Sequence, residues 1–276
     1  MRQMKTIIRN IILVPVLIWT LFPVYWMVSL AFRSSEELAG KISLLPHSVT
    51  FVHILELFRE NGFGAAIVNS ITVAFISLAI ALVCGIPCAY IFSRKNYGYR
   101  LRTPMMGWVL LIRVLPPIAF AIPLYAMMNY FGLLSTSVPI ILSHVLLNLP
   151  FIIWFLISFF AGTPIEIEES ARVDGAGDFT IFFKVILPLV APGIAAVAIL
   201  SFMTSWNEYL YGVIFVQSPQ QFTIPLVLST MNSEQELTQW GTVAAGGVVS
   251  LIPIILFVAL AQDALISGLS GGAVKE

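Results

Sequence analysis

The feature that most constrains the fold of this chain is a series of apolar runs, each long enough to cross a lipid bilayer. A hydrocarbon core about 30 Å thick requires about 20 apolar residues in helical form. Six runs meet this length, near Ile7–Phe32, Ala65–Phe92, Pro104–Met128, Val138–Phe160, Leu189–Phe215 and Thr242–Ile266. The sequence therefore predicts an all-α membrane protein with six transmembrane helices in a single domain, residues 1–276.

Composition agrees with a membrane location. Charged residues make up 10% of the 276 residues, whereas a soluble domain usually carries about 25%. The formal net charge is zero, which gives no electrostatic support for a nucleic-acid partner. The run Ile7–Phe32 is long and lacks a small-residue cleavage site after a short core, so we interpret it as a retained span.

Lysine and arginine in the connections predict the orientation, because cytoplasmic loops carry an excess of these residues. Three lie on one side, in the connection Arg33–Gly64, which we expect to contain short interfacial helices, and Arg113 lies within a span. The other ten lie on the opposite side: Arg2, Lys5, Arg9, Arg94, Lys95, Arg100, Arg102, Arg172, Lys184 and Lys275. Both termini are therefore predicted to be cytoplasmic.

The sequence offers neither a metal site nor a nucleotide site of a familiar kind. Cys84 and Cys88 lie one helical turn apart in an apolar run and provide too few ligands for zinc. We expect them to be small buried apolar residues rather than a redox pair. There is no Gly-rich loop followed by Lys and Ser or Thr, so a function driven by ATP would require another chain to bind the nucleotide.

One predicted cytoplasmic connection, Gly162–Pro188, is unusual because it is acidic. Five of its side chains are carboxylates and only Arg172 and Lys184 are basic. Acidic residues do little to set topology, so they do not change the predicted orientation. The acidity of this connection therefore needs a separate explanation.

The local pattern of this connection predicts two short helices. Thr163 and Glu166 have the spacing of a capping box around Pro164, which suits the first helical position. Glu168 and Arg172 are four residues apart and are expected to pair. Gly175 is expected to end the helix in a left-handed conformation.

A second short helix is expected to follow. Asp178 can cap it, and Phe179, Phe182, Phe183 and Ile186 are expected to share one face. Pro188 is expected to mark a bend into the fifth span. On capping alone, the connection could be no more than a well-formed cytoplasmic connector.

A longer pattern in the same connection indicates a more specific function. Glu169-Ser170-Ala171, three residues, Gly175, nine residues and Val185-Ile186-Leu187-Pro188 resemble the EAA signature of ABC importer permeases, with Ser170 and Val185 as mild departures. Trp206-Asn207-Glu208-Tyr209 and the tail Gly268–Lys275 resemble segments of the maltose-type carbohydrate permeases. The chain is thus similar to the six-span inner-membrane subunit of binding-protein-dependent sugar importers over nearly its whole length.

This resemblance implies a set of roles and partners. In the family the EAA loop docks in a cleft of a cytoplasmic ATPase, which implies a coupling loop at residues 162–188 with Glu168, Glu169, Ser170, Ala171, Asp174 and Gly175 as docking residues. ATP and Mg²⁺ would bind to the ATPase, and this chain would bind no cofactor and catalyse no reaction. The other implied partners are a second permease, a dimer of ATPase subunits, an extracytoplasmic solute-binding protein, the sugar and membrane lipid.

Three further points follow from the resemblance. The chain would lie in the bacterial cytoplasmic (inner) membrane as a multi-pass subunit. Its loop at residues 216–241 would face the solute-binding protein, by position only. The tail Gly268–Lys275 would reach the ATPase dimer. The substrate could be a mono-, di- or oligosaccharide or a polyol.

Polar residues within the spans are candidates for the substrate pathway. Arg113 lies near mid-membrane and is followed by Pro116 and Pro117, which should break or bend the helix. A broken span beside a charge is typical of a translocation site, but Arg113 could instead bond the carbonyls that the prolines free.

Further candidates lie in the fifth span. Asn207, Glu208 and Tyr209 could contact sugar hydroxyls or an apolar sugar face. Glu208 could alternatively pair with Arg113, and the aromatic residues Trp206, Tyr209 and Tyr211 could form an interfacial belt. His144 and Asn148 are expected to be helix–helix hydrogen-bonding groups rather than ligands.

Two other functional classes fit less well. An ion-coupled carrier or channel acting without an ATPase would be expected to show several intramembrane carboxylates and an internal repeat. The main carboxylate within the predicted spans is Glu208, since Asp263 lies near the cytoplasmic end of the last span. The sequence also shows no convincing internal repeat. An intramembrane enzyme would need a catalytic pair at workable spacing, and none is apparent.

Overall fold

The computed structural model describes residues 2–94, 99–134, 136–231 and 239–273, with side chains over residues 13–94, 103–134, 136–231 and 240–259. Within these ranges every regular element is a helix, which confirms the all-α prediction. The elements are α1 (Arg2–Ala31), α2 (Ser35–Ala39), α3 (Val52–Arg59), α4 (Phe63–Ser93), α5 (Tyr99–Val114), α6 (Ile118–Tyr130), α7 (Val138–Gly162), α8 (Ile165–Val173), α9 (Asp178–Thr180), the π-helix η1 (Ile181–Ile186), α10 (Leu187–Trp206), α11 (Leu210–Phe215), the 3-10 helix η2 (Pro219–Gln221), α12 (Ile224–Thr230) and α13 (Gln239–Ala273).

The predicted spans match this helix order, and one of them is broken. Among the described residues, five helical stretches are long and apolar enough to cross a membrane: Leu13–Ala31, Phe63–Ser93, Val138–Gly162, Asp178–Trp206 and Trp240–Ala259. The expected third span is instead a pair of helices, Thr103–Val114 and Pro117–Tyr130, that meet at 98°. The break falls at Pro116 and Pro117, as the sequence predicts, because proline removes a helical hydrogen bond and clashes with the preceding turn.

The fifth span differs from its prediction at both ends. It begins at Asp178, and its helical structure continues through Pro188. The reason is the π-helix η1, in which the Leu187 N–H donates to the Phe182 carbonyl five residues back. This wider turn changes the hydrogen-bond register just before the proline, so the helix continues. The residues expected to share one face, Phe179, Phe182, Phe183 and Ile186, do not do so: Phe179 and Phe183 are exposed, whereas Ile186 is buried.

At its other end the fifth span stops at Trp206 rather than at Phe215. The Asn207 side-chain amide donates to the Met203 carbonyl at 2.9 Å, which satisfies an acceptor at the helix end. Glu208 then accepts hydrogen bonds from the backbone N–H groups of Tyr211 and Gly212, at 2.9 and 3.4 Å. Local side-chain bonds therefore end one helix and begin the next.

The chain divides into two compact units, residues 1–66 with 224–253 and residues 67–223 with 254–276. The first unit contains the short helices α2 and α3 that the sequence predicts between the first two spans. Two of its glycines allow close packing of α13: a Cβ at Gly247 would lie 2.7 Å from the Met27 sulfur, and one at Gly246 would overlap Leu228.

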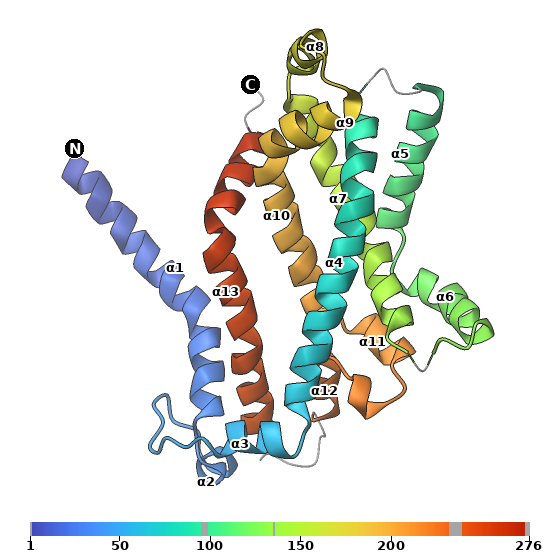
Figure 1. Cartoon of the computed structure of the whole chain (residues 1–276). Coiled ribbons are helices and arrows are strands. Elements are labelled where there is room, and N and C mark those ends of the chain that lie inside the picture. The colour runs from blue at the N-terminus through green and yellow to red at the C-terminus, as the bar shows by residue number, and fades with distance from the viewer. Residues whose placement is uncertain (1, 95–98, 135, 232–238, 274–276) are drawn as a thin grey trace. The chain divides into compact units, whose positions relative to one another are not determined.

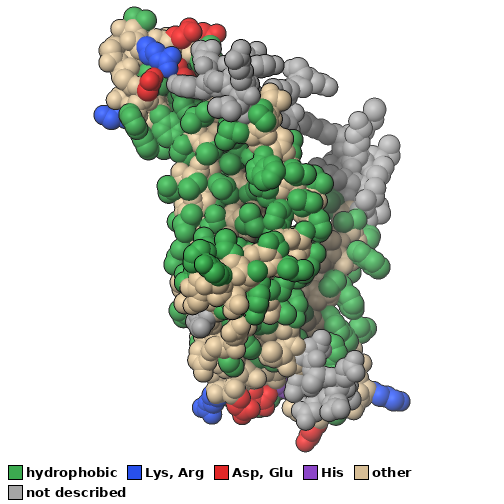
Figure 2. All heavy atoms as spheres, turned by 90° about the vertical axis from the view of Figure 1, so that its right-hand side faces the viewer, with side chains coloured by type: hydrophobic (Ala, Val, Ile, Leu, Met, Phe, Trp, Pro, Cys, Tyr) green, Lys and Arg blue, Asp and Glu red, His purple; other side chains and the backbone are tan. Residues whose placement is uncertain are grey.

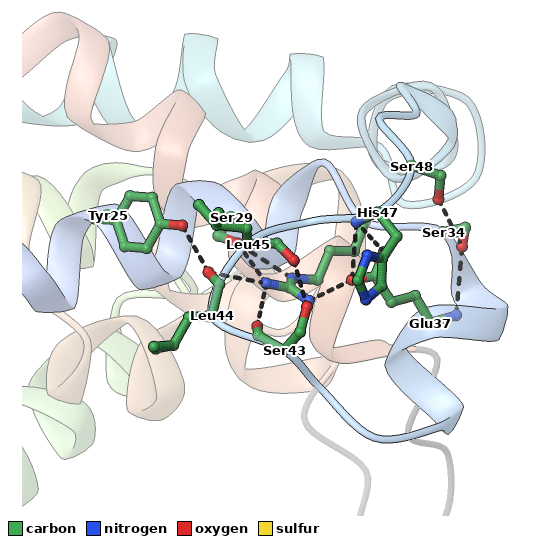
Figure 3. Close-up of polar contacts among 10 residues, drawn as sticks. Tyr25, Ser29, Ser34, Glu37, Ser43, Leu44, Leu45, His47 and Ser48 are labelled. Carbon is green, nitrogen blue, oxygen red and sulfur yellow. Dashed lines mark hydrogen bonds and ion pairs between the residues drawn. The ribbon is translucent and has the colours of Figure 1, made fainter.

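Arg33 organises the connection after α1 in this first unit. Its side chain is fully buried and pairs with Glu37. It also donates to the Ser29 hydroxyl at 3.0 Å and to the Ser43 carbonyl at 2.6 Å. Figure 3 shows the surrounding groups, with Tyr25 reaching the Leu44 carbonyl and Glu37 reaching the backbone N–H of His47. The loop is therefore held by bonds to its backbone.

The second unit is a helical bundle in which α7 and α10 pack closely together. A Cβ at Gly193 would lie 2.5 Å from the Phe159 ring, and one at Gly85 on α4 would lie 2.8 Å from Ile152. Phe257 of α13 stacks on Phe202 of α10 with ring centroids 4.6 Å apart. Figure 1 shows α8 at one end of this unit, with α6 and α11 toward the other end.

Two contacts, one near each end of α4, show how far apart the two ends of the second unit lie. Asn69 donates to the Gln220 carbonyl at 2.8 Å near the start of α4, and Arg94 contacts Glu168 of α8 just beyond its end. A helical path of 25 residues spans about 37 Å, which exceeds the hydrocarbon core of a bilayer at about 30 Å. The connection Gly162–Pro188 with α8, here called the acidic hairpin, and the segment at η2 are therefore far enough apart to lie on opposite sides of the membrane core.

Side chains on the flank of the second unit suit a lipid or protein environment. Large apolar residues such as Val68, Val83, Trp108 and Ile122 are exposed. Figure 2 shows that hydrophobic side chains dominate this flank, below the charged residues at the α8 end. Cys84 is exposed and Cys88 half-buried, and both are free thiols. The expectation that both are buried is therefore wrong, because α4 presents Cys84 outward.

Candidate functional site

The acidic hairpin is built around α8, and Gly175 ends it as predicted. Gly175 has φ +84°, a conformation that glycine adopts without steric cost. Its N–H donates to the Arg172 carbonyl and the Ala176 N–H donates to the Ala171 carbonyl, both at 3.0 Å. This pair of bonds is a Schellman motif, which satisfies the last carbonyls of the helix.

The start of α8 differs from the predicted capping box. Pro164 is the N-cap and no side chain caps the helix. Thr163 instead ends α7, and its hydroxyl donates to the Phe159 carbonyl at 3.2 Å. The prediction is wrong because α7 extends to Gly162, which brings Thr163 within reach of its last turn.

Glu168 lies inside the protein rather than on the hairpin surface. Its side chain is 1% exposed, and Oε1 lies 2.7 Å from both Nε and Nη2 of Arg94. Its Oε2 accepts a hydrogen bond from the Tyr90 hydroxyl at 2.9 Å. The predicted pair with Arg172 is therefore wrong: Arg172 pairs with Asp178 at 3.1 Å in an exposed contact.

The remaining residues of the signature form the outer surface of the hairpin. Glu169, Ser170, Asp174 and Gly175 are exposed, and Ala171 is half-buried. The face thus combines two carboxylates with small residues over a single helical turn and its cap. Figure 2 shows acidic and basic side chains together at this end of the second unit.

A second candidate site is a cavity of about 340 Å³ within the second unit. Arg113 lines it, with its guanidinium 4.7 Å from the Phe151 ring centroid and 4.8 Å from that of Trp154. Stacking on aromatic faces is favourable for a cation. The other described lining residues are Ile112, Leu115, Pro117, Phe120, Leu146, Leu147, Asn148, Pro150, Phe151, Thr204 and Tyr211.

The cavity thus brings together polar groups from three parts of the chain, and the sequence suggested only Arg113. Asn148 is buried, and its Oδ1 has no hydrogen-bond partner in the described part of the chain. The Tyr211 hydroxyl donates to the Pro117 carbonyl at 2.9 Å, so tyrosine rather than Arg113 bonds a carbonyl beside the prolines. The break after Trp206 turns Tyr211 toward the cavity. The sequence predicted one continuous span, Leu189–Phe215, and therefore did not indicate this position of Tyr211.

The polar residues near the fifth span have separate places. Glu208 lies 3.3 Å from His144 Nε2 and holds the start of α11, so the alternative pair with Arg113 is wrong. Asn207 and Tyr209 are exposed and lie outside the cavity lining, as do Glu208 and Pro116. Trp206 and Tyr211 are buried, so neither belongs to an interfacial belt.

The expected helix–helix role of His144 and Asn148 is confirmed. His144 on α7 contacts Glu208 just after α10, and the Asn148 side-chain amide donates to Ser205 of α10 at 2.8 Å. Such bonds hold transmembrane helices in register. The tail Gly268–Lys275 and the residues 232–238 of the outer loop lie outside the residues whose side chains are described.

Comparison with known proteins gives the family of this chain. Residues 81–271 match the family described as "Binding-protein-dependent transport system inner membrane component". The chain belongs to this family. As an inner-membrane component of such a system, it is a permease subunit of an ATP-driven (ABC) importer in the inner membrane.

Relatives cover almost the whole of this permease. It is 35% identical over 93% of both chains to the trehalose transport system permease protein SugB of Mycobacterium tuberculosis. It is 29% identical to the sulfoquinovosyl glycerol transport system permease protein SmoH of Agrobacterium fabrum, over 92% of this chain and 89% of the relative. The permease YcjP of Escherichia coli is 31% identical over 94% and 92%.

Solved structures show the same fold for this permease. A chain of a bacterial ABC transporter that imports alginate superimposes with a TM-score of 0.80 at 21% identity, over 95% of this chain and 96% of that one. A chain of the MetNI methionine ABC transporter gives 0.63 at 17%, over 80% and 99%. The chain therefore has the type I ABC importer permease fold.

Proposed function

We propose that this permease imports a carbohydrate or polyol and that α8 is the coupling helix through which a separate ATPase drives it. The observation that carries the proposal is the two-sided construction of α8. Glu168 ties its inner side to α4, whereas Glu169, Ser170, Asp174 and Gly175 remain exposed on its outer side. A short helix fixed from within and open outside can receive a rigid-body motion and pass it to the spans.

The chemistry of the outer face suits a docking cleft. Ser170 and Ala171 are small enough to let the helix sit deep in a groove, and the carboxylates of Glu169 and Asp174 can bind basic groups of the partner. Glu168 then has the role of an internal support of this docking element. ATP and Mg²⁺ would bind to a dimer of ATPase subunits, so this chain would itself be non-catalytic.

The assignment of a carbohydrate or polyol rests on the relatives, since the permeases SugB, SmoH and NgcG are described as transporting trehalose, sulfoquinovosyl glycerol and diacetylchitobiose. The chain would form half of the pathway, with a second permease as the other half. In this pathway Arg113 would contact the substrate from the cavity wall. Pro116, Asn207, Glu208 and Tyr209 would shape the two helix breaks that border the pathway.

We place the α8 end of the second unit and both chain termini in the cytoplasm, following the excess of lysine and arginine. The C-terminal end of α13 lies at the same end of its unit as α8 (Figure 1), which supports this orientation. The loop at residues 216–241 would then face the solute-binding protein. Coupling by α8 would convert ATPase closure into alternating access of the cavity.

The coupling role can be tested at Gly175 and Glu169 in the complete importer. We expect Gly175→Pro to abolish sugar uptake, because φ +84° is closed to proline, and Glu169→Lys to do the same by reversing a docking charge. Gly175→Asn is the matched control, since asparagine tolerates the left-handed conformation. Uptake is measured together with membrane insertion and ATP hydrolysis.

The results also separate the importer from an ion-coupled carrier. An importer loses uptake when ATP is depleted, even if the ion gradients are clamped. If Gly175→Pro and Glu169→Lys both insert and still transport at the wild-type rate per ATP, α8 is not the coupling helix.

A further inference from the structure

Arg94 is the hub of a buried junction between α4, α7 and α8. We call Tyr90, Arg94, Phe160, Thr163 and Glu168 the Arg94 junction. Arg94 lies just after the last residue of α4 and is 6% exposed. Its Nε and Nη2 both lie 2.7 Å from Glu168 Oε1. The same guanidinium therefore joins the end of a transmembrane helix to the middle of α8.

The other side of the guanidinium holds the end of α7. Arg94 Nη1 donates to the Phe160 carbonyl at 2.8 Å and to the Thr163 carbonyl at 3.1 Å. The last carbonyls of a helix have no partner within the helix, and a cation suits the negative end of its dipole. One side chain thus contacts three elements through its planar fork of donors, which lysine could not reproduce.

Tyr90 completes the junction from the preceding turn of α4. Its hydroxyl donates to Glu168 Oε2 at 2.9 Å, so both carboxylate oxygens have partners. Its ring lies 5.5 Å from that of Phe160 and 5.0 Å from that of Phe182, measured between centroids. Aromatic packing therefore surrounds the ion pair and excludes water, which strengthens the electrostatic attraction between Arg94 and Glu168.

A purely structural role explains this arrangement poorly. Apolar residues of similar volume often stabilise a protein as well as a buried ion pair does, because both charges must be desolvated. What the charged pair adds is direction: the carboxylate fixes where α8 lies relative to the cytoplasmic end of α4. The α4 helix then carries any displacement of that end to Asn69, about 37 Å away.

We propose that Arg94 is a positioning residue for energy coupling, which makes α4 move as one body with α8. This proposal rests on the assignment of α8 as the coupling helix. Motion received by α8 then reaches the opposite side of the membrane along α4 as well as along α10, which follows α8, α9 and η1 in the chain. Breaking the Arg94–Glu168 pair leaves the outer face of α8 free to bind the ATPase but disconnects it from α4.

The test uses the complete importer in lipid nanodiscs and proteoliposomes. Arg94→Gln, Glu168→Gln and the double variant remove the charges with little change in volume, and Tyr90→Phe removes one hydrogen bond. Asp178→Asn is the matched control, because it removes an exposed carboxylate from the same hairpin. Each variant is assayed for retained ATPase subunits, ATP hydrolysis and substrate transported per ATP.

We expect Arg94→Gln and Glu168→Gln to retain the ATPase subunits but to transport roughly tenfold less substrate per ATP. The double variant should be no worse than either single variant, because both remove the same connection. Tyr90→Phe should have a smaller effect, and Asp178→Asn should stay within twofold of wild type.

A distance measurement separates positioning from simple stabilisation. Spin labels on Glu166 of α8, which lies outside the docking residues, and on Ile91 of α4, both exposed, should keep one distance between nucleotide-free and nucleotide-trapped states in the wild type and change it in Arg94→Gln. Unchanged transport per ATP, loss of the ATPase subunits, or an unchanged label distance in Arg94→Gln overturns the proposal. If Arg94→Gln leaves transport per ATP unchanged while Glu169→Lys abolishes uptake, α8 is the coupling helix but Arg94 does not position it. If neither substitution changes transport, the proposed coupling role of α8 is wrong too.

Discussion

Arginine has different roles at three positions of this chain. Arg33 and Arg94 each follow the end of a helix, are buried and pair with a carboxylate while binding backbone carbonyls of a neighbouring segment. Arg113 is exposed to a cavity and stacks on Phe151 and Trp154. In the described part of the chain it has no ion pair, so its charge is available to a ligand or to a partner chain.

The cavity role of Arg113 predicts a defined order of substitutions. Arg113→Ala should lower the initial uptake rate about 5-fold, since a cation–π contact at an exposed site is worth up to about 1 kcal/mol. Arg113→Lys should retain part of the activity, because it keeps the charge but loses the planar face. Rates are measured in proteoliposomes at equal permease content.

Arg59→Ala controls for the loss of one positive charge, because Arg59 is exposed at the end of α3. We expect it to transport within twofold of wild type. Wild-type uptake by Arg113→Ala would exclude Arg113 from the pathway.

At the scale of elements, close contact between α7 and α10 depends on positions where any side chain would collide. A Cβ at Gly193 would lie 2.5 Å from an aromatic carbon of Phe159, whereas a Cβ at Gly107 on α5 would meet nothing within 4 Å. The His144–Glu208 and Asn148–Ser205 contacts lie along the same helices. Steric fit and polar contacts therefore fix one register between α7 and the fifth span.

This difference predicts opposite outcomes for two identical substitutions. Gly193→Ala should destabilise the permease by about 1–3 kcal/mol, because it forces the helices apart or displaces Phe159. Gly107→Ala should be neutral or slightly stabilising, since alanine favours a helix over glycine. Thermal unfolding of the purified complex in one detergent compares the two, and equal melting temperatures would contradict the packing argument.

At the scale of the whole chain, the sequence predicted what depends on composition and length and missed what depends on distant contacts. Apolar runs located the spans, Pro116 and Pro117 located the 98° break, and Gly175 located the end of α8. The burial of Glu168 was not predictable, because its partner Arg94 lies 74 residues away and a local partner, Arg172, has ideal helical spacing. The break after Trp206 was missed for a different reason: the bonds that form it are local, but the run Leu189–Phe215 is long enough to be predicted as one continuous span.

The two ends of the second unit give the final prediction, which concerns membrane orientation. Glu166 on α8 and Gln220 in η2 are exposed and lie at opposite ends of α4. In a variant with Cys84 and Cys88 replaced by serine, Glu166→Cys should react with an impermeant maleimide only from the cytoplasmic side, in inside-out vesicles. Gln220→Cys should react only from the outside, in intact spheroplasts. Since about 37 Å of helix separates the two positions, reaction of both from one side would contradict this orientation and, with it, the access of a cytoplasmic ATPase to α8.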